Sequence, residues 1–212
     1  MNSDSNTRLY YIHDPMCSWC WGFKPGLEQL HQQLPDNISI KYVLGGLAAD
    51  SDQDMPAKMQ QFLQQTWHTI ENKIPGTRFN FDFWTHCKPR RSTYPACRAV
   101  IAAKKQDPSL ERKIIDEIQQ AYYLQAKNPS DDSTLIKIAE NLNLDTKVFT
   151  FDLNSNDTKK ILSDEILLAN KLGAQGFPSL VFENSQRTLL HLDYTNVENI
   201  FEQITQLNQL SG

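Results

Sequence analysis

Two cysteines near the start of the chain, Cys17 and Cys20, have the spacing of a redox-active pair. The thiolate is the reactive form of cysteine, and the free N–H groups and positive dipole end of a helix N-terminus stabilise it. Cys17 would attack a substrate disulfide, and Cys20, one helical turn further on, would resolve the mixed disulfide. Ser18 and Trp19 between them would tune the thiolate, and Trp19 also offers an apolar surface to a peptide.

The segments around this motif predict how it is positioned. Residues 8–12 are β-branched and aromatic and indicate a buried strand, and residues 38–44 alternate like a second strand. Residues 18–33 between them have helical spacing, with an expected kink at Pro25. The motif therefore lies at the first strand-to-helix junction of a β-α-β unit, a context that favours a redox site.

The rest of the chain divides into a helical stretch and a second α/β portion. Between residues 51 and 156 no strand-like run occurs, and Asp131 or Asp132 is expected to cap one of the helices. The helices expected there lie around Phe62–Ile70 and over 95–105, 108–124 and 132–141. A further helix is expected over 157–172, strands over 179–183 and 188–192 joined by a hairpin turn, and a last helix over 196–207.

Composition is that of an ordinary globular protein. The chain has 212 residues, 40% hydrophobic and 22% charged, which suffices for a core without disulfides. The net charge of -4 lacks the basic footprint of a nucleic-acid-binding protein, and no apolar run approaches the ~20 residues that span a bilayer. Residues 1–7 are polar and lack the apolar stretch of a secretory signal. We therefore expect a cytoplasmic protein without nucleic-acid or membrane partners.

A proline motif precedes the third expected strand, in the order Gly176-Phe177-Pro178-Ser179. X-Pro bonds are cis in only about 5–6% of folded cases, usually in tight turns. The residues by themselves fit either isomer, and the simplest interpretation is a proline that starts a strand after a glycine turn.

Taken together, Cys17-Ser18-Trp19-Cys20 after the first strand and Gly176-Phe177-Pro178-Ser179 before a later one resemble the DsbA family of the thioredoxin superfamily. The stretch 14–21 is most similar to its cytoplasmic FrnE-like branch, which is related to 2-hydroxychromene-2-carboxylate isomerase and kappa-class glutathione transferase. The order of elements covers nearly the whole chain. DsbA itself is exported and has a histidine between its cysteines, whereas this chain has Ser18 and Trp19 there. We therefore do not expect this chain to share the strongly oxidising redox potential of DsbA.

The resemblance implies an α/β, thioredoxin-like fold formed by residues 1–50 and 157–212, with a large helical insertion over 51–156. It implies that Pro178 is cis and packs beside Cys17, and that the backbone of Phe177 pairs with an extended substrate. The implied activity is thiol–disulfide exchange with protein or small thiol substrates. No cofactor and no metal are implied, although glutathione is a possible redox partner.

The other two cysteines, Cys87 and Cys97, leave alternatives open. With His86 they could complete a zinc site, but their spacing lacks a compact knuckle. In the related glutathione-using branch a segment similar to 92–99 lies near the active cleft, which would place Ser92, Thr93 and Cys97 near Cys17. Cys97 would then be an accessory thiol that relays disulfides. The competing interpretation, favoured for Cys87, is a buried cysteine that packs like a small hydrophobe.

Charged residues near these cysteines are also candidates. Lys88, Arg90 and Arg91 could attract the carboxylates of glutathione, or could simply be solvated, as could Arg98. His13 could stabilise the thiolate as a cation or could face solvent at the end of its strand. Two alternative functions remain: a glutathione-dependent isomerase or transferase, against which Cys20 argues, and a metal-binding interaction protein.

Overall fold

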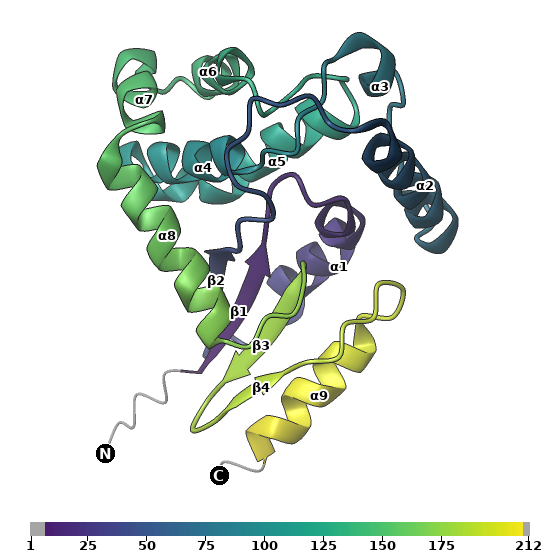
Figure 1. Cartoon of the computed structure of the whole chain (residues 1–212). Helices are drawn as coiled ribbons and strands as arrows, with labels where there is room; N and C mark the ends of the chain where they lie inside the picture. The colour runs from purple at the N-terminus through teal and green to yellow at the C-terminus, as the bar shows by residue number, and fades with distance from the viewer. Residues whose placement is uncertain (1–6, 210–212) are drawn as a thin grey trace.

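A mixed sheet of four strands forms the centre of the computed structural model, which describes residues 7–209 (Figure 1). The strands are β1 (Arg8–His13), β2 (Ser39–Leu44), β3 (Ser179–Glu183) and β4 (Arg187–Leu189), in the spatial order β2-β1-β3-β4. β1 pairs parallel to β2 and antiparallel to β3, and β3 pairs antiparallel to β4. This topology confirms the predicted α/β class.

Helices cover both faces of the sheet because the side chains of β1 alternate between them. Leu9 and Tyr11 belong to the main core with α1 (Ser18–Gln33) and α9 (Glu198–Gln209). Tyr10 and Ile12 point the other way and pack with residues of α8 (Asn156–Lys171). α1 runs without interruption through Pro25, and its buried face includes Phe23 and Leu30. The loop between β1 and α1 is thereby fixed at both ends.

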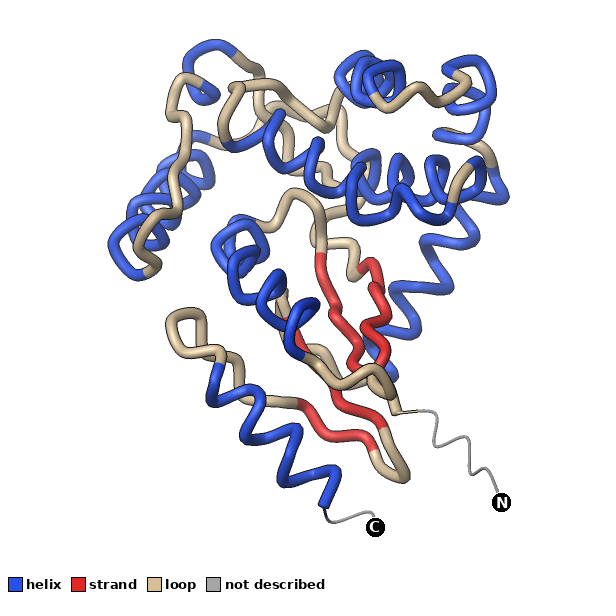
Figure 2. The backbone as a smooth tube through the Cα atoms, turned by 180° about the vertical axis from the view of Figure 1, so that it is seen from behind, coloured by secondary structure: helices blue, strands red, loops and turns tan. Residues whose placement is uncertain are grey.

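The remaining helices form a layer across the end of the sheet at which β1 and β2 finish (Figures 1 and 2). They are α2 (Ala57–Lys73), α3 (Phe83–His86), α4 (Tyr94–Gln106), the 3₁₀ turn η1 (Pro108–Leu110), α5 (Glu111–Tyr123), α6 (Asp132–Asn141) and α7 (Thr146–Leu153). Trp67 is 1% exposed and its ring contacts those of Phe79, Phe83 and Tyr122. This aromatic cluster holds the helical layer together.

Several local expectations need correction. Asp131 occupies the N-cap of α6 without a side-chain hydrogen bond to it. β4 ends at Leu189, earlier than expected, because the backbone of His191 pairs instead with the side chain of Gln203 in α9, with bonds of 2.8 and 2.9 Å. The helices α3 and α7 were not individually expected.

Candidate active site

The loop that carries Cys17 turns sharply between β1 and α1. Its backbone is closed by two hydrogen bonds to Asp14: the N–H of Cys17 donates to the Asp14 carbonyl (3.0 Å) and the N–H of Met16 to the Asp14 carboxylate (2.8 Å). Cys17 is the N-cap residue of α1, and the first turn of that helix contains no acidic side chain. The positive end of the helix dipole therefore acts on the Cys17 sulfur without an opposing carboxylate from that turn.

The thiol of Cys17 faces the proline motif. It is 5% exposed, and its Sγ donates to the carbonyl oxygen of Phe177 at 3.3 Å. The Phe177–Pro178 peptide bond is cis, which confirms the isomer that the family resemblance implied. Gly45 makes this approach possible, since a Cβ at that position would lie 2.0 Å from the Phe177 ring. The motif from the far end of the chain thus lies directly against the first cysteine.

Cys20 lies behind Cys17 and is 1% exposed. Burial raises the pKa of its thiol well above the usual value, and its hydrogen bond and charge interaction with Cys17 raise it further. All four cysteines lie within residues 7–209 and none is in a disulfide. The pair is therefore in the dithiol form, with Cys17 as the outer sulfur and Cys20 as the inner one.

A cavity of about 220 Å³ opens at Cys17. It is mostly apolar, and Arg91 is the one basic side chain in its lining. The lining residues are Met16, Cys17, Ser18, Trp19, Leu47, Phe62, Leu63, Thr66, Trp67, Arg91, Tyr122 and Phe177. Three of the residues singled out from the sequence, Cys17, Trp19 and Phe177, meet here. The helical layer supplies the opposite wall.

Trp19 is half-buried and fixed by its neighbours. Its ring contacts that of Tyr194 with centroids 5.0 Å apart, and the Lys73 ammonium lies 5.6 Å from its centroid. These contacts come from the end of α2 and from the segment that precedes α9. They hold the indole at the rim of the cavity as a rigid apolar surface.

Two residues of the site were missed from the sequence, Phe62 and Asp14. Phe62 was expected on the apolar stripe of its helix, but it is 60% exposed and lines the Cys17 cavity. The sequence does contain a signal that Phe62 lies off the buried face of this helix. Phe62 and Trp67 are five residues apart, which at helical periodicity places their side chains about 140° from each other around the helix axis. Asp14, three residues before Cys17, is completely buried.

The candidate residues of the helical layer differ in how close they lie to the active-site loop. Thr93 and Cys97 do lie near the active-site loop, since both donate to the Asp14 carboxylate, at 2.6 and 3.4 Å. Cys97 has no exposed surface, so a substrate disulfide has no route to its sulfur in this conformation. Cys87 is half-buried and donates to the Ala126 carbonyl at 3.1 Å. In residues 7–209, no group of three or more His, Cys, Asp or Glu side chains is placed to hold a metal ion.

The basic residues do not act as one cluster. Arg90 pairs with Asp131 at 2.6 Å. Arg98, expected to be solvated, is 4% exposed and pairs with Asp50 at 2.8 Å. Arg91 alone among these arginines faces the Cys17 cavity.

Both interpretations of His13 were wrong. The ring has no exposed surface, and its two nitrogens have no hydrogen-bond partner in the described part of the chain. It stacks on Tyr11, with ring centroids 5.0 Å apart, and meets the edge of Tyr42. Burial, together with the nearby charge of Lys104, lowers the pKa of His13 to about 3. His13 is therefore neutral and supplies no positive charge to Cys17.

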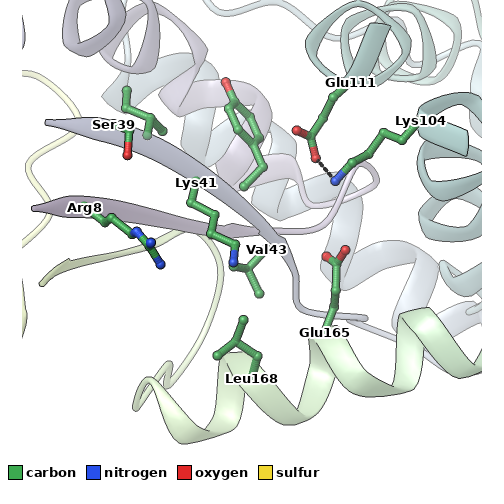
Figure 3. Close-up of a pocket in the computed structure, with 10 residues that line it drawn as sticks. Arg8, Ser39, Lys41, Val43, Lys104, Glu111, Glu165 and Leu168 are labelled. Carbon is green, nitrogen blue, oxygen red and sulfur yellow. Dashed lines mark hydrogen bonds and ion pairs between the residues drawn. The ribbon is translucent and has the colours of Figure 1, made fainter. Parts of the chain in front are cut away.

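A larger cavity, of about 440 Å³, lies away from the cysteines along the edge strand β2 (Figure 3). Lys104 pairs there with Glu111, and Glu165 of α8 accepts from the Leu44 N–H at 2.7 Å. Lys41 lies apart from these groups, beside Val43, and its side chain points toward Leu168 of α8 (Figure 3). The lining of this larger cavity contains no thiol, and its two carboxylates, Glu111 and Glu165, already have an ion-pair or hydrogen-bond partner. We therefore place the chemistry at the smaller cavity.

A Cys-x-x-Cys at the N-terminus of the first helix, facing a cis-proline across the tip of a mixed sheet, defines a thioredoxin-fold protein with a dithiol site. The family model described as thioredoxin matches residues 10–203, and the chain belongs to that family. The resemblance to the DsbA branch is confirmed at the level of fold by the solved structures below. None of the helices in residues 7–209 is long and apolar enough to cross a membrane.

Solved structures with this fold include disulfide-exchange proteins. The chain is 27% identical to a putative protein disulfide isomerase from Nitrosomonas europaea, with a TM-score of 0.84 over 98% of this chain and 100% of that one. It is 22% identical to the cytosolic disulfide reductase DsbM from Pseudomonas aeruginosa, with a TM-score of 0.76 over 95% of this chain and 99% of that one. The second likeness shows the fold alone.

Among curated proteins, the chain is similar to the ClpXP adapter protein SpxH of Bacillus subtilis. The two are 25% identical over 179 residues, which cover 84% of this chain and 58% of SpxH. The chain thus spans about three fifths of the length of these relatives.

Proposed function

We propose that this protein is a thiol–disulfide oxidoreductase in which Cys17 is the nucleophile and Cys20 the resolving thiol. The observation that carries the proposal is the asymmetry of the pair: Cys17 opens to a cavity at a helix N-terminus, and Cys20 is sealed behind it. An attacking thiolate needs access and electrostatic stabilisation, whereas a resolving thiol needs only to reach its neighbour.

The exchange proceeds in two steps. The Cys17 thiolate attacks one sulfur of a substrate disulfide, forms a mixed disulfide and releases the other sulfur as a thiolate that takes up a proton. Cys20 then loses its proton and attacks the Cys17 sulfur, which gives the Cys17–Cys20 disulfide and a second substrate thiol. The substrate gains two electrons and two protons, and the protein loses them. The reverse sequence oxidises a dithiol substrate, and the two sulfurs carry both electrons without a bound cofactor.

The cavity favours a peptide as substrate. The carbonyl of Phe177 beside the Cys17 sulfur is placed to accept a backbone N–H from an extended chain, and Trp19 and Phe62 offer apolar contacts beyond it. Arg91 could pair with a carboxylate, which glutathione would supply, and one DsbM structure was solved with GSH. We therefore propose protein disulfides as substrates, glutathione as the small redox partner, and the cytoplasm as the compartment.

A glutathione redox titration tests the proposal. Thiols are alkylated at each ratio of glutathione to its disulfide, and each cysteine is located by peptide mass. We expect one reversible disulfide, between Cys17 and Cys20. Cys17→Ser should abolish reduction of a peptide disulfide, and the matched variant Cys87→Ser, which changes a half-buried thiol outside the cavity, should retain it. Turnover by Cys17→Ser at the wild-type rate would refute the mechanism.

A further inference from the structure

The carboxylate of Asp14 is the most heavily hydrogen-bonded side chain near the thiols. It has no exposed surface, yet four groups donate to it. One oxygen accepts from the N–H of Met16 (2.8 Å), and the other accepts from the N–H of Leu47 (2.7 Å), the hydroxyl of Thr93 (2.6 Å) and the thiol of Cys97 (3.4 Å). These donors belong to the active-site loop, to the segment after β2 and to the start of α4. A single carboxylate therefore ties three segments together.

This carboxylate has no countercharge. None of the ion pairs formed within residues 7–209 includes Asp14. Its neighbour His13 is neutral, as shown above. Burial raises the pKa of Asp14, and the four hydrogen bonds oppose that rise. An amide at this position would lose part of this hydrogen bonding, because all four partners are donors and the amide nitrogen would face at least one of them.

The charge of Asp14 acts on the thiols around it. Its main-chain carbonyl accepts from the N–H of Cys17 and its carboxylate from the N–H of Met16, so both groups of Asp14 contact the reactive loop. Burial is the main cause of the raised pKa of both Cys20 and Cys97, and the negative charge of Asp14 adds to the rise in each. The same charge adds to the raised pKa of Tyr122, which lines the Cys17 cavity. The buried anion therefore makes a thiolate at Cys20 or at Cys97 less stable.

We propose that Asp14 is a positioning residue for thiol–disulfide exchange. Its carboxylate anchors the Cys17 loop to Leu47 and to Thr93 of the helical layer, and its charge shifts the equilibrium of the pair toward the Cys17–Cys20 disulfide. A sulfur of the reduced pair can carry a negative charge and the sulfurs of the disulfide cannot, so a nearby negative charge penalises only the reduced form. The inference rests on the proposed function, and it makes the helical layer part of the redox site.

The first test measures the equilibrium of the pair with glutathione and its disulfide at neutral pH, read by mass after alkylation. Asp14→Asn removes the charge, and we expect the equilibrium constant to shift about tenfold toward the dithiol. Thr93→Val removes the hydroxyl that donates to Asp14 and accepts from the N–H of Ala48 but keeps the charge, and its equilibrium constant should stay within about twofold of the wild type. An Asp14→Asn protein that unfolds more easily but keeps the wild-type constant would overturn the electrostatic role.

The second test addresses the anchor and does not depend on the stability of Asp14→Asn. Thr93→Val should let the loop open, so that iodoacetamide alkylates Cys17 several-fold faster, whereas Thr93→Ser keeps the hydroxyl and should match the wild type. Thr158→Val is the control, because Thr158 is also buried and its hydroxyl accepts from that of Ser155 at 3.1 Å, but it lies in α8 outside the site. An unchanged Cys17 rate in Thr93→Val would overturn the anchor.

The two proposals fail in different ways. If wild-type protein forms no Cys17–Cys20 disulfide, both the proposed function and the inference fall. If wild-type protein forms it and the Asp14 and Thr93 variants behave like wild type, only the inference falls.

Discussion

The imidazole of His13 is buried without a hydrogen-bond partner in the described residues, and this predicts acid sensitivity. Its pKa is about 3 in the folded chain against an ordinary value near 6.5 in the unfolded one. Between these values the unfolded state binds the extra proton, so stability is lost as pH falls from about 6.5 toward 3. Above that window His13 is neutral in both states and contributes no pH dependence.

The measurement is the thermal midpoint at neutral pH and at about pH 5. His13→Phe keeps an aromatic ring against Tyr11 and Tyr42 and removes the titration, so it should lose much less stability on acidification than the wild type does. His191→Phe changes an exposed histidine and should keep the wild-type response. The lowered pKa of Glu183 also makes stability fall with acid, but only below its ordinary value near 4.5. An equal drop in wild type and His13→Phe would contradict the assignment.

At the scale of elements, α2 brings an exposed aromatic side chain to the nucleophile. Phe62→Ser should raise the KM for a peptide disulfide roughly tenfold, since an apolar contact of that size is lost, and leave kcat nearly unchanged. Kinetics with 2-hydroxyethyl disulfide, which is too small to reach Phe62, should not change. Phe151→Ser is the matched control, because Phe151 is 77% exposed on α7, at the opposite end of the helical layer from α2 (Figure 1). Equal effects of the two variants would refute a substrate contact.

Most elements follow from the sequence because their signals are local. The strands β1, β2 and β3 and the helix α1 were expected within one or two residues, since each has a regular apolar pattern and a clear end. α3 has only four residues and no periodicity to detect. α7 is preceded by its N-cap residue Asp145, whose side chain accepts from the N–H groups of Lys147 and Val148.

The site was only partly predictable, for a physical reason. Cys17, Trp19 and Phe177 belong to motifs that can be recognised within short stretches of sequence. The role of Asp14 depends on Leu47 and Thr93, which lie 33 and 79 residues away along the chain. Such contacts are set by the packing of the helical layer on the sheet, which no local pattern encodes.

At the scale of the whole molecule, the helical layer is held to α1 by apolar packing more than by charge. Trp21 of α1 stacks on Tyr123 of α5, and the ion pair between Glu28 and Arg112 joins the same two helices in an exposed position. Paired charges in solvent contribute little, whereas a buried aromatic ring contributes much. The division of the chain at residues 51 and 157 remains a prediction, and α8 packs against both β2 and α4.

Urea unfolding distinguishes the two contributions. Trp67→Ala should lower the free energy of unfolding by about 3–5 kcal/mol, because it opens a cavity at the centre of the aromatic cluster. Glu28→Gln should lower it by less than about 1 kcal/mol. A larger loss in Glu28→Gln than in Trp67→Ala would show that charge holds the layer.

The placement of Trp19 has a spectroscopic consequence. The chain has four tryptophans, and Trp19 and Trp21 stand on either side of Cys20. Trp19 is also held rigidly against Tyr194 beside the reactive sulfur. A disulfide quenches the emission of a nearby indole. Oxidation of the Cys17–Cys20 pair should therefore lower the intensity of the tryptophan fluorescence, and reduction of the pair should restore it. The molecule carries its own optical readout of redox state, and each turnover can be followed without a label.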